Sequence, residues 1–112
     1  MKEVKAYVHH SRVADVIAAI KNSPAWGGAS GAHRHNLAVY VVQGSLVAVE
    51  VNETHYSMDL GDEVVKEYKI ELLCEDSEVD SIVHDLVAAA RTGQEVAGWV
   101  TVSELTQAVP IH

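Results

Sequence analysis

The stretch Val64–Cys74, VVKEYKIELLC, constrains the fold most strongly, because its side chains alternate between two chemical kinds. Tyr68, Ile70, Leu72 and Cys74 share one face of an extended chain, whereas Glu67, Lys69 and Glu71 share the other. Successive side chains of a strand point to opposite faces of its sheet, so this pattern predicts a strand with one buried face. The rest of the chain must therefore supply a cover for that face.

Two amphipathic helices are predicted to supply this cover. The first has Ser11 as its N-cap and ends near Asn22, and its apolar stripe consists of Val13, Val16, Ile17 and Ile20. The second has Ser77 as its N-cap, with acidic Glu78 and Asp80 in its first turn. Its stripe consists of Val79, Ile82, Val83, Leu86, Val87 and Ala90, and Gly93 is predicted as its left-handed stop.

Four strands are predicted around these helices. Residues 3–8 form the first, and the β-branched run 36–51, interrupted by Gly44, follows a loop over residues 22–35 that is rich in turn-forming residues. Residues 99–102 form the last of the four, and residues 106–111 are expected as an additional short edge strand closed by Pro110. The order β-α-β-β-α-β predicts an α+β, ferredoxin-like fold: one domain, residues 1–112, with two helices on one face of a four-stranded antiparallel sheet.

Composition excludes several classes of function. The formal charge of −8 argues against a nucleic-acid-binding protein, which needs a basic face. No run reaches the roughly 18 apolar residues of a membrane span, and the first residues do not have the pattern of a secretory signal. Cys74, the single cysteine, cannot form an internal disulfide. These features indicate a cytoplasmic protein.

The segment KIELLCEDSEVDSIVHDLVAAARTG, followed by GWVTV, resembles the PII signal-transduction proteins. The resemblance covers most of the chain. It implies a homotrimer that binds adenine nucleotides in clefts between subunits and has no enzymatic activity. The interval between Gly44 and Lys69 is similar to the family's T-loop, which contacts a regulated protein, here an unknown transporter or enzyme. Residues 89–102 are similar to the B-loop, which lies against nucleotide phosphates.

The resemblance also implies which residues bind the nucleotide. Glu71 and Leu73 are expected near the adenine, Thr92 near the adenine amino edge or the ribose, and Gly44, Gly93 and Gly98 where backbone amides approach the ligand. Arg91 and Trp99 complete this set. No residue is assigned to a metal, and no cofactor is expected.

The chain departs from the family pattern at the positions that meet phosphates. Val96 replaces a glycine, Ala97 replaces an aspartate, and Trp99 replaces a basic residue. An indole has one N–H donor and cannot offset the desolvation of a polyphosphate. The remaining cations within reach are Arg91 and either Arg12 or Arg34, so AMP or ADP is expected to bind at least as well as ATP. Bicarbonate is expected as a co-ligand near Gly44, as in divergent PII-like proteins that accompany carbon-concentrating systems.

Two alternatives stay open. A metal-responsive PII-like protein could bind Zn or Cu through the pair His33 and His35 or through His9 and His10, although no cysteine or carboxylate stands beside a pair at a recognised spacing. An enzyme is the weaker alternative, because no nucleophile elbow, HExxH or P-loop pattern is present.

The expected trimer has an argument of its own. The uncovered face of the sheet carries apolar Val65 and Leu73 beside Glu67, Lys69 and Glu71. These apolar residues predict that another subunit covers that face.

Overall fold

The alternating stretch forms β4 (Asp62–Cys74) in the computed structural model, which describes residues 1–26, 37–46, 48–49 and 52–112. β4 begins two residues before the predicted strand and is 13 residues long. Ile70, Leu72 and Cys74 are each at most 1% exposed, so the predicted buried face is confirmed.

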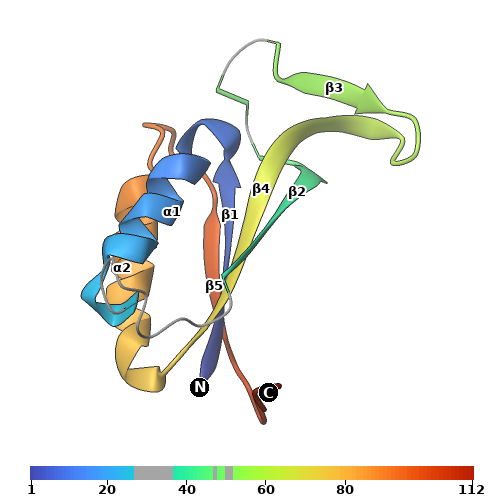
Figure 1. Cartoon of the computed structure of the whole chain (residues 1–112). Coiled ribbons are helices and arrows are strands. Elements are labelled where there is room, and N and C mark those ends of the chain that lie inside the picture. Colours follow the sequence, from blue (N-terminus) through green and yellow to red (C-terminus); the bar gives the residue numbers. More distant parts are fainter. Residues whose placement is uncertain (27–36, 47, 50–51) are drawn as a thin grey trace.

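β4 lies at the centre of an antiparallel sheet whose order is β2-β4-β1-β5. Its neighbours are β2 (Ala38–Gly44) and β1 (Lys2–His9), and β1 pairs in turn with β5 (Trp99–Glu104). A further strand, β3 (Thr54–Ser57), pairs with the first residues of β4. The sheet therefore has five strands rather than the predicted four, because part of the T-loop interval folds back as a β3–β4 hairpin that projects from the sheet (Figure 1).

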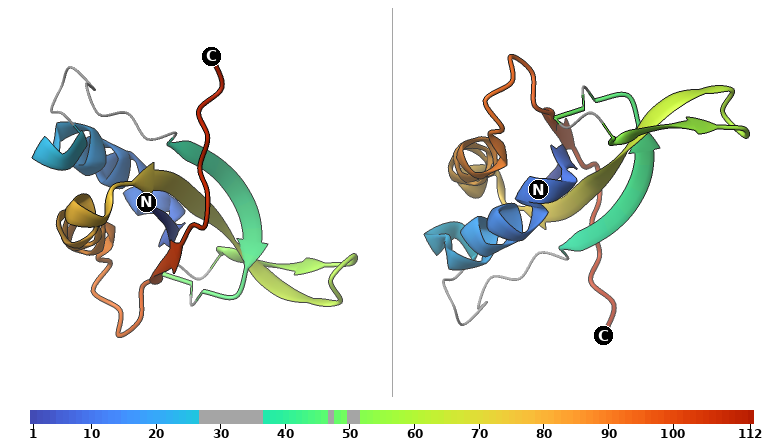
Figure 2. Two further views of the ribbon diagram at one scale, coloured as in Figure 1. Left: turned by 90° about the horizontal axis from the view of Figure 1, so that it is seen from below. Right: turned by 90° about the horizontal axis from the view of Figure 1, so that it is seen from above.

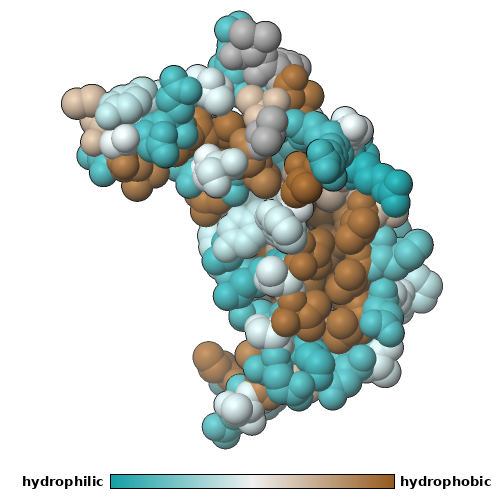
Figure 3. Space-filling view, turned by 180° about the vertical axis from the view of Figure 1, so that it is seen from behind, coloured by the Kyte–Doolittle hydropathy of each residue, from teal (hydrophilic) through white to brown (hydrophobic). Residues whose placement is uncertain are grey.

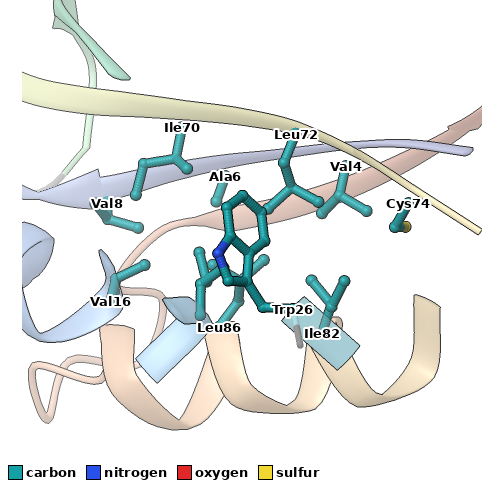
Figure 4. Close-up of a cluster of buried hydrophobic side chains, with 11 residues drawn as sticks. Val4, Ala6, Val8, Val16, Trp26, Ile70, Leu72, Cys74, Ile82 and Leu86 are labelled. Carbon is teal, nitrogen blue, oxygen red and sulfur yellow. The ribbon is translucent and has the colours of Figure 1, made fainter. Parts of the chain in front are cut away.

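Both helices, α1 (Val13–Asn22) and α2 (Val79–Ala90), pack on the same side of the sheet (Figures 1 and 2). Figure 4 shows the core between the two layers, where side chains from β1 and β4 point towards both helices. The core consists of Val4, Ala6, Val8, Val16, Ile20, Trp26, Ile70, Leu72, Cys74, Ile82 and Leu86. The α+β, ferredoxin-like arrangement predicted from the sequence is confirmed.

The helix starts differ from the prediction. A 3-10 turn, η1 (His10–Arg12), precedes α1, and the His9 imidazole rather than Ser11 caps it by accepting a hydrogen bond from Ser11 N. A second turn, η4 (Asp76–Glu78), precedes α2, and its cap is Glu75 rather than Ser77. Glu75 and Glu78 form a reciprocal capping box, in which the Glu75 carboxylate takes the place of the Ser or Thr side chain that is usual at the N-cap.

The loop predicted over residues 22–35 begins with regular structure. Pro24–Trp26 forms the 3-10 turn η2, and Trp26 is 6% exposed and packs in the core. Residues 27–36 lie outside the described residues. The turn-forming composition of the segment concealed a core residue, because an isolated tryptophan produces no periodic signal.

Three further details at the C-terminal end were not as predicted. Arg91, in an extended conformation, ends α2, so Gly93 does not stop the helix. β5 extends two residues beyond the predicted end at Val102, to Glu104. Residues 105–112 form no strand, and the predicted edge strand over 106–111 is wrong.

On the uncovered face of the sheet, one apolar residue that was expected to be exposed in a single chain is buried. Val65 is only 3% exposed within a single chain, opposite Gly44 of β2 and Thr54 of β3. It therefore needs no second subunit to cover it, and this part of the argument for a trimer is wrong. Leu73, opposite Glu3 of β1, is half-buried. None of the helices among the described residues is long and apolar enough to cross a membrane.

Candidate functional site

The loop between α2 and β5, residues 91–98, walls an open pocket of about 560 Å³. The size is within the range usual for small-molecule sites. Its lining consists of Tyr7, Val8, Val87, Ala90, Arg91, Thr92, Gly93, Gln94, Glu95, Val96, Ala97, Gly98, Trp99 and Val100. Five of the eight residues predicted to bind nucleotide line this pocket, namely Arg91, Thr92, Gly93, Gly98 and Trp99.

The two glycines of this loop are needed for different reasons. Gly93 has a φ of 89°, in the left-handed region that L side chains disfavour, and no atom of the described residues lies within 4 Å of the position of its missing β-carbon. Gly98 instead lies against the main chain of β1, where a β-carbon would collide with the carbonyl oxygen of Tyr7. Gly93 therefore shapes the turn, whereas Gly98 allows the loop to approach the sheet.

Polar contacts within the loop engage Thr92 and Gln94. The Thr92 hydroxyl donates to Gln94 Oε1 at 2.9 Å and accepts from Gln94 N at 3.4 Å. Gln94 Nε2 in turn donates to the carbonyl oxygen of Ala48 at 3.3 Å, in the T-loop interval four residues after β2 ends. The predicted B-loop and T-loop are thus in direct contact within one chain.

Positive charge at the pocket is sparse. Arg91 is the one lysine or arginine among its described lining residues, and Glu95 offsets its charge. Arg12 is held elsewhere: its Nε donates to Ala89 O at 3.0 Å, and its guanidinium pairs with Asp15 at 3.0 Å. Arg34 lies outside the described residues.

Trp99 presents its indole at the mouth of the pocket. The side chain is 62% exposed, and Trp99 is the register partner of Tyr7 across β1 and β5. An exposed indole beside the loop offers an apolar face suited to stacking rather than to binding phosphate.

Gly44 lies at the end of β2, outside the pocket lining, and packs against Glu67. The Glu67 carboxylate occupies the space that a β-carbon on Gly44 would need. Glu67 is 5% exposed and accepts a hydrogen bond from Leu46 N at 3.3 Å. Burial raises the pKa of this carboxyl, although the Leu46 N–H opposes the shift.

Glu71 and Leu73 lie on the uncovered face of β4, also outside the pocket lining. Glu71 accepts a hydrogen bond from the Tyr40 hydroxyl and forms an ion pair with Lys69 at 3.0 Å. Both contacts lower the pKa of Glu71, the Tyr40 bond most. The Lys69 ammonium lies 5.7 Å from the ring centroid of Tyr7, so Tyr7 stands between this polar network and the pocket.

The metal alternative named two pairs of histidines. His33 and His35 fall outside the described residues. His9 and His10 both contact Glu53, a carboxylate 43 residues or more away in sequence. Sequence spacing could not reveal this carboxylate, because only the return of the T-loop brings it to the end of β1.

The fold and the loop-lined pocket place the chain among ferredoxin-like α+β proteins. Comparison with protein-family models gave no match. Over all 112 residues, the chain is 28% identical to a nitrogen regulatory protein P-II of Microchaete diplosiphon, covering 92% of that protein. It is 26% identical to nitrogen regulatory protein P-II 2 of Methanothermobacter thermautotrophicus and 26% identical to a nitrogen regulatory protein P-II of Nostoc punctiforme, covering 90% and 92% of them.

The chain is thus similar over its full length to PII proteins, in agreement with the resemblance in its sequence. All three relatives are named as nitrogen regulatory proteins.

Proposed function

We propose that this protein is a non-enzymatic, cytoplasmic PII-like sensor of adenine nucleotides that binds AMP or ADP at least as well as ATP. It assembles as a homotrimer and acts on a partner protein through its T-loop. The observation that carries this proposal is the pocket before β5, which gathers five of the predicted nucleotide-binding residues around a loop with a left-handed glycine.

The charge of the pocket supports the preference for fewer phosphates. ATP carries three to four negative charges at neutral pH, and each extra phosphate needs cations or well-placed donors to offset its desolvation. Arg91 is the one basic residue in the described lining, Glu95 opposes it, and Asp15 already pairs with Arg12. This set suits one or two phosphates, with the Trp99 indole packing on the adenine and ribose.

In this proposal Glu71 and Leu73 contact the nucleotide bound by a neighbouring subunit, not the one in the pocket of their own chain. Both lie on the uncovered face of the sheet, away from the pocket of their own chain. In a trimer, the neighbouring subunit brings such residues to a cleft between subunits, which accounts for their separation from Trp99 and Gly93 in one chain.

Bicarbonate is proposed as a co-ligand at the base of the T-loop near Gly44. The carboxylate of Glu67 stands there, so an anion needs Glu67 to hold a proton or to move. The raised pKa of Glu67 favours the first route, since a protonated carboxyl can donate a hydrogen bond to bicarbonate. We expect Glu67→Gln to bind bicarbonate at least as tightly as the wild type.

The β3–β4 hairpin supports contact with a partner protein. Its exposed apolar side chains are Tyr56, Met58 and Leu60, which are 59%, 85% and 59% exposed. The hairpin projects beyond the body of the sheet (Figure 2), so a partner can reach these side chains without contacting the helices. The regulated partner is proposed to be a transporter or an enzyme.

Calorimetry with AMP, ADP and ATP on the full chain tests the nucleotide proposal. We expect AMP or ADP to bind at least as tightly as ATP. ATP binding tenfold tighter than ADP, a difference of about 1.4 kcal/mol, would contradict the preference, and failure of all three nucleotides to bind would overturn the sensor itself.

A matched pair of variants locates the phosphate end of the ligand. Trp99→Lys places a cation at the pocket and should strengthen ATP binding relative to AMP by at least tenfold. Thr101→Lys adds the same charge on the same strand, two residues further and outside the pocket lining, and should leave the ratio unchanged.

A further inference from the structure

Three metal-ligating side chains from two distant segments meet at the end of β1. His9 ends β1, His10 follows it in η1, and Glu53 comes from the residues just before β3. His9 Nε2 lies 2.6 Å and His10 Nε2 lies 3.1 Å from the same oxygen, Glu53 Oε1. One ligand atom from each of the three residues lies within 4.8 Å of the other two.

The spacing of these atoms suits a small divalent ion. Zinc bonds of about 2.0–2.1 Å in a tetrahedral site place the ligand atoms roughly 3.3 Å apart. The two distances to Glu53 Oε1 are slightly shorter than this, so modest outward rotation of the side chains makes room for an ion. The two imidazole rings already lie close, with centroids 4.2 Å apart and planes tilted by 34°.

Two of the three side chains are buried and one is exposed, an arrangement that suits a metal site. The side chains of His9 and Glu53 are 3% and 8% exposed, whereas that of His10 is 45% exposed. The two buried ligands are shielded from competing water, and the exposed ligand leaves a route for the ion. A buried carboxylate between two imidazoles also gives the site the negative charge that a cation needs.

Two of the three ligands, Glu53 and His9, make second contacts that orient them. Glu53 Oε2 accepts a hydrogen bond from Val49 N at 2.8 Å, which orients the carboxylate and leaves Oε1 towards the histidines. His9 Nδ1 accepts a hydrogen bond from Ser11 N at 3.1 Å and lies 2.7 Å from Ser11 Oγ. In the other tautomer Nδ1 carries the proton and donates to Ser11 Oγ instead of accepting from Ser11 N. The lone pair of Nε2 is then available to an ion, as metal-binding histidines require.

We propose that His9, His10 and Glu53 bind a divalent transition-metal ion of the zinc class, leaving a fourth position for water. Two imidazole nitrogens and one carboxylate oxygen form a ligand set that zinc accepts. On binding, the imidazole of His9 changes tautomer: the proton leaves Nε2 and one is taken up at Nδ1, so no net proton is released from this ring. The site is separate from the pocket before β5 and does not depend on nucleotide binding.

The ion would control where the T-loop lies. Glu53 belongs to the T-loop interval, whereas His9 and His10 belong to the end of β1 and the start of the first helical segment. Coordination joins these segments by bonds stronger than the present hydrogen bonds and holds the chain just before the β3–β4 hairpin against the sheet. The metal therefore fixes the base from which the exposed hairpin residues face a partner.

Calorimetry with ZnCl₂ on the metal-stripped full chain tests this site, together with the visible spectrum after Co²⁺ substitution, which reports the ligand set. We expect the wild type to bind one Zn²⁺ ion per chain at this site. Glu53→Gln and His10→Gln should each weaken Zn²⁺ binding at least tenfold and alter the Co²⁺ spectrum. His10 is the more exposed ligand, so His10→Gln keeps the test decisive if Glu53→Gln folds poorly.

Two control variants separate this site from other histidines. His84→Gln changes a histidine that is 82% exposed and should bind Zn²⁺ as the wild type does. The double variant His33→Gln, His35→Gln should also keep the site, because the proposed ligands are His9, His10 and Glu53. Wild-type Zn²⁺ affinity in His10→Gln, or loss of binding in the double variant, would overturn the proposal. Nucleotide titration of the same variants shows whether the pocket before β5 is intact, so the two proposals can fail independently.

Discussion

The carboxylate of Glu67 lies against the backbone of Gly44, in the space that a β-carbon would fill. β2 and β4 pair Gly44 with Val65, so Glu67 reaches back along β4 to meet it. The same carboxylate accepts a hydrogen bond from Leu46 N at 3.3 Å. The last residue of β2 and the first turn of the T-loop are thus both positioned by one buried acid.

Gly44→Ala should destabilise the protein by about 1–3 kcal/mol, the range typical of overpacking a filled site. The added methyl group forces Glu67 away from Leu46 N. In a Glu67→Ala background the same change should cost much less, because the colliding group is absent, and urea denaturation of the two single variants and the double variant measures this coupling. Additive costs in this cycle would show that the two residues do not contact each other in solution.

Glu67→Gln should stabilise the protein at pH 7. Burial raises the pKa of Glu67 above 4.5, so the folded state holds the proton more tightly than the unfolded state does. The contribution of this group to stability is therefore fully present below pH 4.5 and is lost as the pH rises through the folded-state pKa. Glutamine stays neutral and avoids that loss.

Urea denaturation at pH 4 and pH 7 checks the pH dependence of this effect, with the gap between Glu67→Gln and wild type expected to shrink at the lower pH. Glu63→Gln, an exposed change on the same strand, controls for the altered net charge. A gap of equal size at both pH values would argue against titration of Glu67.

Gly98→Ala should destabilise the fold by about 1–3 kcal/mol, because the new methyl group meets the carbonyl oxygen of Tyr7. That oxygen belongs to β1 and cannot move without disturbing its pairing with β5. Gly93→Ala should cost about 1–2 kcal/mol for a different reason, the left-handed backbone. Asparagine tolerates that conformation, so it should recover part of the loss at position 93 and none at position 98, as thermal denaturation would show.

Light scattering at micromolar concentration should give three times the 12.1 kDa mass of one chain. Figure 3 shows hydrophobic surface in the middle of the face opposite that of Figure 1. Val87 of α2 and Val102 of β5 are 45% and 42% exposed, although Val87 belongs to the apolar stripe predicted for its helix. Exposed apolar surface of this kind marks an interface between proteins.

Val102→Asp should weaken the trimer, because the carboxylate must be desolvated when subunits associate. Val109→Asp, at a valine that is 69% exposed in the strand-free C-terminal segment, is the matched control and should leave the mass unchanged. A wild-type mass near that of a single chain would rule out the trimer.

Local patterns in the sequence were sufficient to predict the elements and their order. Alternation in VVKEYKIELLC predicted which face of β4 is buried, and the apolar spacing from Val79 to Leu86 predicted the inner face of α2. Such periods arise because a strand or helix repeats its side-chain directions at fixed intervals. Family resemblance added the loop before β5, where five of the eight residues expected at the nucleotide line one pocket.

Contacts between distant segments were decided only by the tertiary structure. Trp26 enters the core from a segment without periodicity, Glu67 packs on Gly44, and Glu53 meets His9 and His10. The periodic pattern of a helix or strand indicates which face each side chain points from. It does not indicate which distant residue that side chain will contact. The path of the T-loop determines these long-range contacts. It therefore also determines the candidate metal site and the burial of Val65, neither of which a local sequence pattern can indicate.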